Sequence, residues 1–167
     1  MFYLTHNKEM LGFNLLKSYP NIFNFTTTRN GGVSTGNYSS LNCSYFSGDK
    51  RECVDTNWSY LLSSVVHKPS HILQPYQIHG DAVLVIDQAF INSSALQQKE
   101  ALHGVDALVT NELNVLITVS TADCVPISIY DPIKKVIAVV HAGWRGTVKH
   151  ILSKVISVMV GRFGCSP

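Results

Sequence analysis

The alternation of apolar and polar residues divides the first half of the chain into short elements. Residues 49–66 carry apolar side chains at spacings of three and four, which predicts a helix with one buried stripe. That stripe consists of Val54, Trp58, Leu61, Leu62 and Val65. Before it, threonines 26–28 run into Asn30-Gly31-Gly32, a pattern typical of a strand that ends in a turn with positive φ. Short strands are expected at residues 71–73 and 82–86, with Gln77-Ile78-His79-Gly80 between them.

Apolar runs dominate the second half, at residues 107–110, 115–120, 125–130 and 136–140. They predict four strands, and the last three are expected to be buried on both faces because both faces are apolar. The small-residue turn from His141 to Gly146 then opens a helix over residues 147–160. The buried stripe expected for that helix consists of Val148, Ile151, Leu152, Val155, Ile156 and Met159. Gly161 and Gly164 are expected to end it.

This order of elements predicts an α/β (α+β) layered fold, with a mixed buried β-sheet flanked by helices. At 167 residues the chain is long enough for one domain with a core, so residues 1–167 are expected to form a single domain. The hydrophobic fraction is 46% and the charged fraction only 14%, which favours a packed protein over a disordered one.

Charge and cysteine content exclude several classes of function. The net charge of +2 is spread without a basic block, so we expect no nucleic-acid partner. We recognise neither a signal peptide nor a membrane-spanning run, and the four cysteines lack C-x-x-C spacing. We therefore predict a cytoplasmic protein with free thiols and no membrane partner. The oligomeric state stays open.

Reactive side chains stand where predicted strands end, the usual place for catalytic groups. Cys124 follows Asp123 at the break between two buried strands, and His141 stands at the mouth of a strand–turn–helix. Imidazole and thiolate ligands suit zinc, and three protein ligands with an open fourth position make a catalytic site. Taken alone, Cys124 is equally well a small buried thiol, and His141 a hydrogen-bonded core histidine.

Three charged residues are candidates to assist such a site. Asp123 can orient a water, accept its proton or hold a ligand histidine. Arg29 and Arg145 can each pair with an anion. Their competing interpretations are a capping carboxylate and solvated surface arginines.

Five motifs, in order along the chain, resemble the YfiH-like, laccase-domain family, whose members are described as polyphenol oxidases or purine nucleoside phosphorylases. The motifs are Thr28-Arg29-Asn30-Gly31-Gly32-Val33-Ser34 with Ser40-Leu41-Asn42, Gln77-Ile78-His79-Gly80, Asp106-Ala107-Leu108-Val109-Thr110, Thr121-Ala122-Asp123-Cys124-Val125-Pro126 and His141-Ala142-Gly143-Trp144-Arg145-Gly146. The resemblance implies a layered fold of helices around mixed sheets, with His79, Cys124 and His141 as metal ligands. The resemblance favours a ligand role for His79 over its other interpretation, a turn histidine before Gly80.

The resemblance also implies a reaction. Members phosphorolyse adenosine, inosine, guanosine or methylthioadenosine to the base and ribose-1-phosphate, and deaminate adenosine. Zinc is the expected metal and copper the alternative. An open metal position can activate water for attack at C6 of adenine, and Arg29 and Arg145 can hold phosphate for attack at the ribose C1′. The family usually continues for several dozen residues beyond the helix after Trp144-Arg145-Gly146, so we expect a C-terminally short member.

Three other functions compete with this one. A copper-dependent polyphenol oxidase would use the same ligand set, but seven histidines without a His-x-His run cannot easily build an additional multinuclear centre. A cysteine hydrolase or deamidase would use Cys124 as nucleophile with His141 or His79 as base. The third is an inactive, metal-stabilised binding module. Metal content, thiol alkylation and turnover of adenosine distinguish these three functions from one another and from the purine nucleoside phosphorylase.

Overall fold

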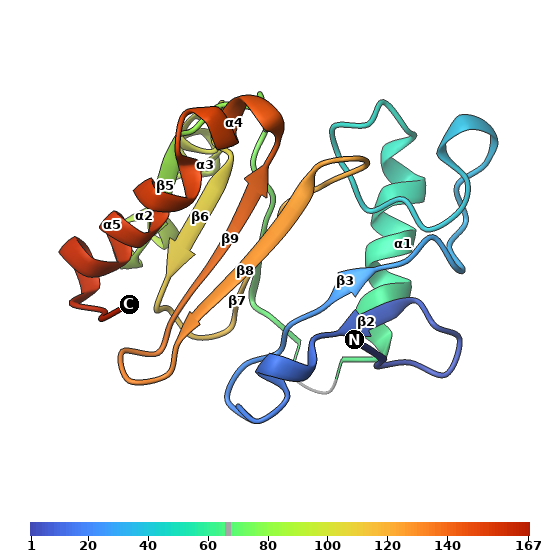
Figure 1. The fold of residues 1–167 in the computed structure, drawn as a ribbon. Coiled ribbons are helices and arrows are strands. Elements are labelled where there is room, and N and C mark those ends of the chain that lie inside the picture. Colours follow the sequence, from blue (N-terminus) through green and yellow to red (C-terminus); the bar gives the residue numbers. More distant parts are fainter. Residues whose placement is uncertain (66–67) are drawn as a thin grey trace. The chain divides into compact units, whose positions relative to one another are not determined.

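The computed structural model describes residues 1–65 and 68–167, so position 66 of the predicted first helix lies outside the described residues. The chain divides into two compact units, Met1–Lys68 (unit 1) and Pro69–Pro167 (unit 2), which are described separately (Figure 1). Several sheets, parallel and antiparallel, combine with helices, which confirms the α/β (α+β) class. The single domain stays a prediction.

Unit 1 combines a small antiparallel sheet with one long helix. The sheet has the order β1 (Phe2–Tyr3), β2 (Met10–Gly12), β3 (Thr26–Thr27). Two 3₁₀ turns, η1 (Asn14–Leu16) and η2 (Gly36–Tyr38), precede helix α1 (Arg51–Ser63). Val54, Trp58 and Leu61 of the predicted stripe are buried on α1. The amphipathic pattern therefore located this helix and its inner face.

The predicted turn after β3 has the backbone that its glycines indicated. Gly31 and Gly32 have φ of 78° and 79°. A Cβ on Gly32 would lie 2.3 Å from the carbonyl oxygen of Ser40, so no side chain fits there. The buried Asn57 on α1 accepts a hydrogen bond from the Val33 N–H at 2.8 Å and donates to the Asn42 carbonyl at 2.8 Å. These contacts hold the loop against the helix.

Unit 2 is built on a four-stranded mixed sheet in the order β5 (Val83–Ile86), β6 (Ala107–Thr110), β9 (Val136–Ala142), β8 (Val125–Asp131). β5 and β6 are parallel, whereas β9 is antiparallel to both β6 and β8. A separate parallel pair joins β4 (His71–Leu73) to β7 (Val115–Ile117). Helices α2 (Gln88–Ile91) and α3 (Ala95–Ala101) connect β5 to β6, and α4 (Trp144–Val148) and α5 (Ile151–Phe163) follow β9.

Two apolar clusters form the core of unit 2. Ile151, Val155 and Met159 of α5 pack with Val136, Ala138 and Val140 of β9, along with Ala107 and Val109 of β6. A second cluster consists of Leu73, Ile86, Phe90, Val105, Leu108, Val115 and Ile117. All four residues of β6 are buried, so this central strand is enclosed on both faces as a continuous apolar run predicts.

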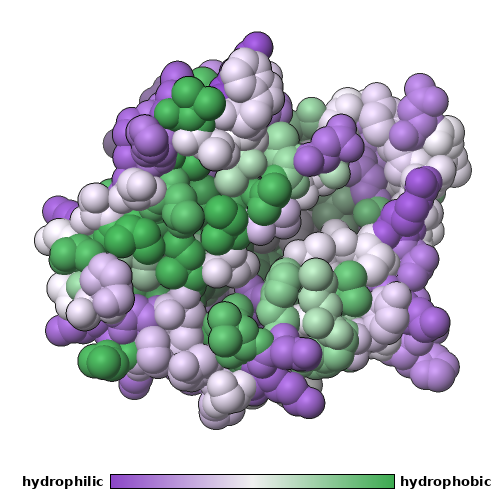
Figure 2. All heavy atoms as spheres, in the orientation of Figure 1, coloured by the Kyte–Doolittle hydropathy of each residue, from purple (hydrophilic) through white to green (hydrophobic). Residues whose placement is uncertain are grey.

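The expected burial of the 125–130 strand is wrong. β8 is the last strand of its sheet, and its first two residues, Val125 and Pro126, are exposed. Figure 2 shows apolar side chains gathered over β8 and α5, where Val125 is 59% and Leu152 42% exposed. Apolar composition alone could not distinguish an edge strand from a central one. The 115–120 strand is also shorter than predicted, because β7 ends at Ile117.

The predicted helix over residues 147–160 is two helices. The chain breaks at His150, whose φ of 59° is left-handed, and α5 restarts with a new phase. Val148 and Leu152, expected on the buried stripe, are therefore exposed. Gly161 lies inside α5, whereas Gly164, with φ of 67°, ends it as predicted.

Helices α2 and α3 were not predicted. The signal for α3 was present, because Ser94 and Gln97 form a capping box at its start. In residues 1–65 and 68–167, no helix combines the length and apolar character that crossing a bilayer requires.

Candidate metal centre

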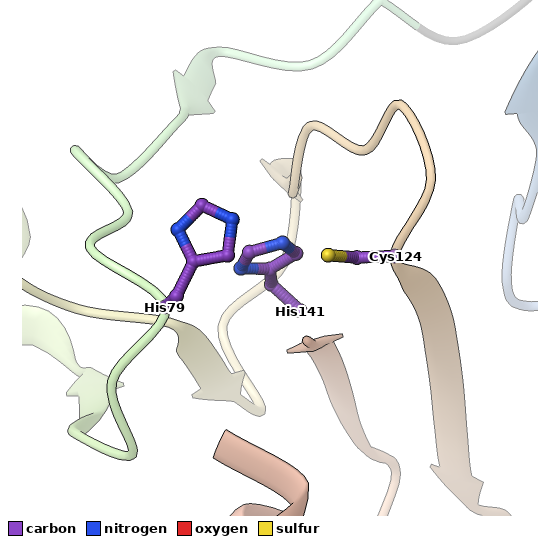
Figure 3. A group of neighbouring side chains, drawn as sticks. All are labelled: His79, Cys124 and His141. Carbon is purple, nitrogen blue, oxygen red and sulfur yellow. The ribbon is translucent and has the colours of Figure 1, made fainter. Parts of the chain in front are cut away.

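The side chains of His79, Cys124 and His141 converge within unit 2 (Figure 3). Their ligand atoms all lie within 4.8 Å of one another. The two imidazole rings meet edge to face, with centroids 4.8 Å apart and planes at 72°. In Figure 3 the Cys124 sulfur points toward the imidazole of His141. The sequence-predicted trio is thus brought together from three separate segments.

Strand pairing brings Cys124 close to His141. In the antiparallel β8–β9 ladder, Val125 pairs with Ala142 and Pro126 pairs with His141. Cys124 directly precedes this ladder, and residues paired across antiparallel strands lie roughly 5 Å apart. The buried His141 at the end of β9 therefore faces the segment that carries the half-buried Cys124.

A glutamine ties the loop before Cys124 to the segment that carries His79. The Gln77 side-chain amide donates to the Ser120 carbonyl at 2.8 Å and accepts from the Ser120 N–H at 2.7 Å. Gln74 also donates to the Ser120 hydroxyl at 3.0 Å. A side-chain amide that bonds both the N–H and the carbonyl of one residue pairs with it as a neighbouring strand would. This pairing limits movement between the loop before Cys124 and the segment that carries His79.

Two glycines allow α4 to approach this centre closely. A Cβ on Gly143 would lie 3.2 Å from both the Cys124 Sγ and the His79 Cδ2, and 3.8 Å from the His141 Cε1. A Cβ on Gly146 would lie 2.5 Å from the Gly80 carbonyl oxygen. Gly143 therefore leaves free the volume between the three candidate ligands that any side chain would occupy.

The donor set and its spacing fit one metal ion. Zinc bonds of about 2.0–2.3 Å in tetrahedral geometry place neighbouring ligand atoms roughly 3.5 Å apart. Donor atoms within 4.8 Å reach that spacing by small side-chain rotations. Two imidazoles and a thiolate suit zinc and also copper. Three protein ligands leave a fourth position open, and the exposed His79 puts it within reach of solvent.

The charged candidates lie in different surroundings. Asp123 is exposed and directly precedes Cys124. Arg145 is exposed in the first turn of α4, with its guanidinium 5.2 Å from the ring of Trp144, which is itself 71% exposed. Arg29 belongs to unit 1, where its guanidinium donates to the Ser39 carbonyl at 2.8 Å.

Sequence reasoning missed Asp106 as a site residue. This aspartate is fully buried, and its Oδ1 lies 2.7 Å from the Nδ1 of His141. The available signal was its position directly before a strand with no polar face, since a carboxylate there must be buried and must find partners. Gln77 and Gly143 were also missed, because their roles depend on neighbours that are distant in sequence.

Comparison with known proteins agrees with the motif analysis. The family described as "Multi-copper polyphenol oxidoreductase laccase" matches residues 23–167. A "Purine nucleoside phosphorylase" of Bacteroides thetaiotaomicron is 45% identical over 99% of this chain and 62% of its own length. "Adenosine deaminase RL5", from an unknown prokaryotic organism, is 37% identical over 90% of this chain and 58% of its own.

Solved structures show the same likeness. The crystal structure of YlmD from Geobacillus stearothermophilus superposes with a TM-score of 0.75 at 32% identity. That match covers 84% of this chain and 52% of YlmD. The resemblance recognised from the five motifs is thereby confirmed, and the chain spans less than two thirds of the length of each of these relatives.

Proposed function

The chain belongs to the family described as multi-copper polyphenol oxidoreductase laccase, and we propose that it is a zinc-dependent purine nucleoside phosphorylase with adenosine deaminase activity. The convergence of His79, Cys124 and His141 carries the proposal, because it supplies a three-ligand site with an open position. The reaction class comes from relatives named purine nucleoside phosphorylase and adenosine deaminase. The proposed substrates are adenosine, inosine, guanosine and methylthioadenosine, with phosphate.

The proposal of one zinc ion rests on the number of available ligands. Within residues 1–65 and 68–167, a single group of three or more His, Cys, Asp or Glu side chains is arranged to hold a metal. A multinuclear copper oxidase needs further imidazoles around that group. The family description names copper, so metal identity is the first property to measure.

Phosphorolysis breaks the bond between the ribose C1′ and the purine nitrogen and forms a bond from C1′ to a phosphate oxygen, while the base leaves with a proton. A zinc ion in the site would supply a Lewis acid. In the proposed arrangement His79, Cys124 and His141 hold that ion. Asp123, beside Cys124 and open to solvent, accepts or delivers a proton.

Substrate binding is assigned to groups at the start of α4. The exposed Trp144 follows Gly143 and offers an aromatic face on which a purine can stack. Arg145 is proposed to bind phosphate through its guanidinium group. A phosphate contact by Arg29, which belongs to unit 1, stays a prediction from the sequence.

The decisive experiment combines elemental analysis of the purified chain with product detection. We expect about one zinc per chain, and hypoxanthine with ribose-1-phosphate from inosine only when phosphate is present. Adenosine should yield inosine without phosphate. Cys124→Ala and His141→Ala should lose zinc and both activities, whereas Cys53→Ala, which removes a free thiol from α1, should lose neither. A metal-free wild type that still cleaves inosine would overturn the proposal.

A further inference from the structure

Asp106 has all its hydrogen-bonding capacity occupied inside unit 2. Its side chain is 0% exposed. Oδ1 lies 2.7 Å from the His141 Nδ1 and accepts from the His79 N–H at 3.0 Å. Oδ2 accepts from the Gly80 N–H at 2.8 Å and from the Ile78 N–H at 3.3 Å. A carboxylate has about four acceptor sites, so Asp106 has none left for a metal ion.

We propose that Asp106 is a positioning residue that holds both candidate imidazole ligands in the orientation that binds the metal. The inference rests on the proposed metal site and assigns Asp106 no contact with substrate or metal. Its role is to select one tautomer of His141 and one backbone conformation of His79, and a single buried side chain does both.

The first contact determines which nitrogen of His141 faces the metal. A carboxylate only accepts hydrogen bonds, so the Nδ1 of His141 must carry the proton that it shares with Asp106. In a neutral imidazole the Nε2 lone pair is then free to bind the ion. A ligand histidine that donates its second nitrogen to a carboxylate is held in tautomer and in ring orientation. The His141 N–H also donates to the Asp106 carbonyl at 2.8 Å, which anchors the same residue a second time.

The remaining contacts hold the backbone that carries His79. His79 has a φ of 60°, in the left-handed region that is unfavourable for a residue with a Cβ. Three successive N–H groups, from Ile78 to Gly80, turn toward one carboxylate in this conformation. Convergent backbone donors of this kind bind an anion, and Asp106 is that anion here. Without it, the loop would lose the interaction that favours the left-handed turn, and the His79 side chain would point elsewhere.

The test compares Asp106→Asn with Asp87→Asn. Asp87 directly follows β5, and its side chain accepts a hydrogen bond from the Phe90 N–H at 3.0 Å. Its substitution therefore removes the same charge from the same unit. Asparagine at 106 places an NH₂ group opposite backbone donors. We expect the zinc Kd, measured by competition with a chromophoric chelator, to rise about 10- to 100-fold for Asp106→Asn and to stay within about twofold for Asp87→Asn.

A second measurement keeps the inference testable if Asp106→Asn does not fold. Nitrogen-15 NMR of the wild-type histidines reports the His141 tautomer directly, and protonation at Nδ1 is expected. The inference fails if His141 is protonated at Nε2 alone, or if folded Asp106→Asn binds zinc as tightly as the wild type. A wild type that binds no zinc overturns the proposed function instead, and the tautomer of the metal-free protein still decides the role of Asp106.

Discussion

Replacing Gly143 with alanine adds one methyl group at the point where the three candidate ligands meet. The new Cβ would lie 3.2 Å from the Cys124 Sγ, 3.2 Å from the His79 Cδ2 and 3.8 Å from the His141 Cε1. Ordinary contacts between carbon atoms are about 3.5–4.0 Å. Two ligands must therefore move outward by roughly 0.3–0.8 Å, whereas metal–ligand distances hold to within about 0.2 Å.

This displacement should weaken zinc binding without unfolding the protein. Gly143 has a φ of −72° and a ψ of 163°, which any residue adopts, so the added methyl group introduces no backbone strain. Alanine is a poorer helix N-cap than glycine, but it restricts the unfolded chain more, and these effects of up to about 1 kcal/mol oppose each other. We expect a zinc Kd that is higher by about 10- to 100-fold, equivalent to about 1.4–2.8 kcal/mol.

Chelator competition measures the zinc affinity, and thermal denaturation of the metal-free protein measures stability. The matched control is Gly161→Ala, because Gly161 lies inside α5 with no heavy atom within 4 Å of its added Cβ. That variant should gain about 0.5–1 kcal/mol of stability and keep the wild-type zinc affinity. If Gly143→Ala binds zinc as tightly as Gly161→Ala, the three side chains do not share one ion in the arrangement described.

Three further predictions concern packing, acid stability and thiol chemistry. Gly146→Ala should lower the free energy of unfolding, measured by urea denaturation, by about 1–3 kcal/mol, because the added Cβ would lie 2.5 Å from the backbone oxygen of Gly80. An unchanged urea midpoint would contradict this close approach. Hydrogen bonds, the largest from the Lys134 N–H, lower the pKa of Asp131 in the folded protein below its ordinary 3.8. The ionised carboxylate therefore stabilises the fold above about pH 3.8, and this contribution is lost as the pH falls through the lower pKa of the folded state. Asp131→Asn should therefore lower the Tm at pH 7 and flatten its fall below about pH 4, and a parallel Tm–pH curve would argue against the assignment. Burial raises the pKa of Cys43 to about 12 and of Cys165 to about 11, so iodoacetamide at pH 7 should spare both. In a Cys53→Ser background, mass spectrometry should then find Cys124 alkylated only after zinc is chelated, whereas rapid labelling of the zinc-loaded protein would favour the cysteine-hydrolase alternative.

Local sequence patterns predicted the elements whose burial or backbone conformation follows directly from their own residues. The stripe of Val54, Trp58 and Leu61 identified α1, because one face of an amphipathic helix must be buried. The apolar run at 107–110 identified β6, which is central in its sheet and buried at every residue. Gly31 and Gly32 marked the turn after β3, since only glycine adopts positive φ without steric cost.

Patterns failed where burial depends on distant neighbours. The 125–130 run was assigned to the core because of its apolar residues, yet β8 has a strand on one side only and exposes Val125 and Pro126. His150, which divides α4 from α5, has a left-handed backbone conformation that no glycine marks in the sequence. A residue other than glycine adopts this unfavourable conformation only where the surrounding structure imposes it, and a local window of sequence does not show where that happens.

The amino-acid sequence by itself determined the fold class, through periodicity and turn residues, and the family, through five motifs. Residue chemistry offered Cys124 and His141 as candidate ligands, whereas His79 was predicted only through the family resemblance. Tertiary structure alone decided that these three residues meet. The β8–β9 register brings Cys124 beside His141, and Gln77 ties the loop before Cys124 to the segment of His79. Asp106 joins His141 to the turn that carries His79. The candidate metal site depends on distances between residues far apart in sequence, and only the packed chain specifies them.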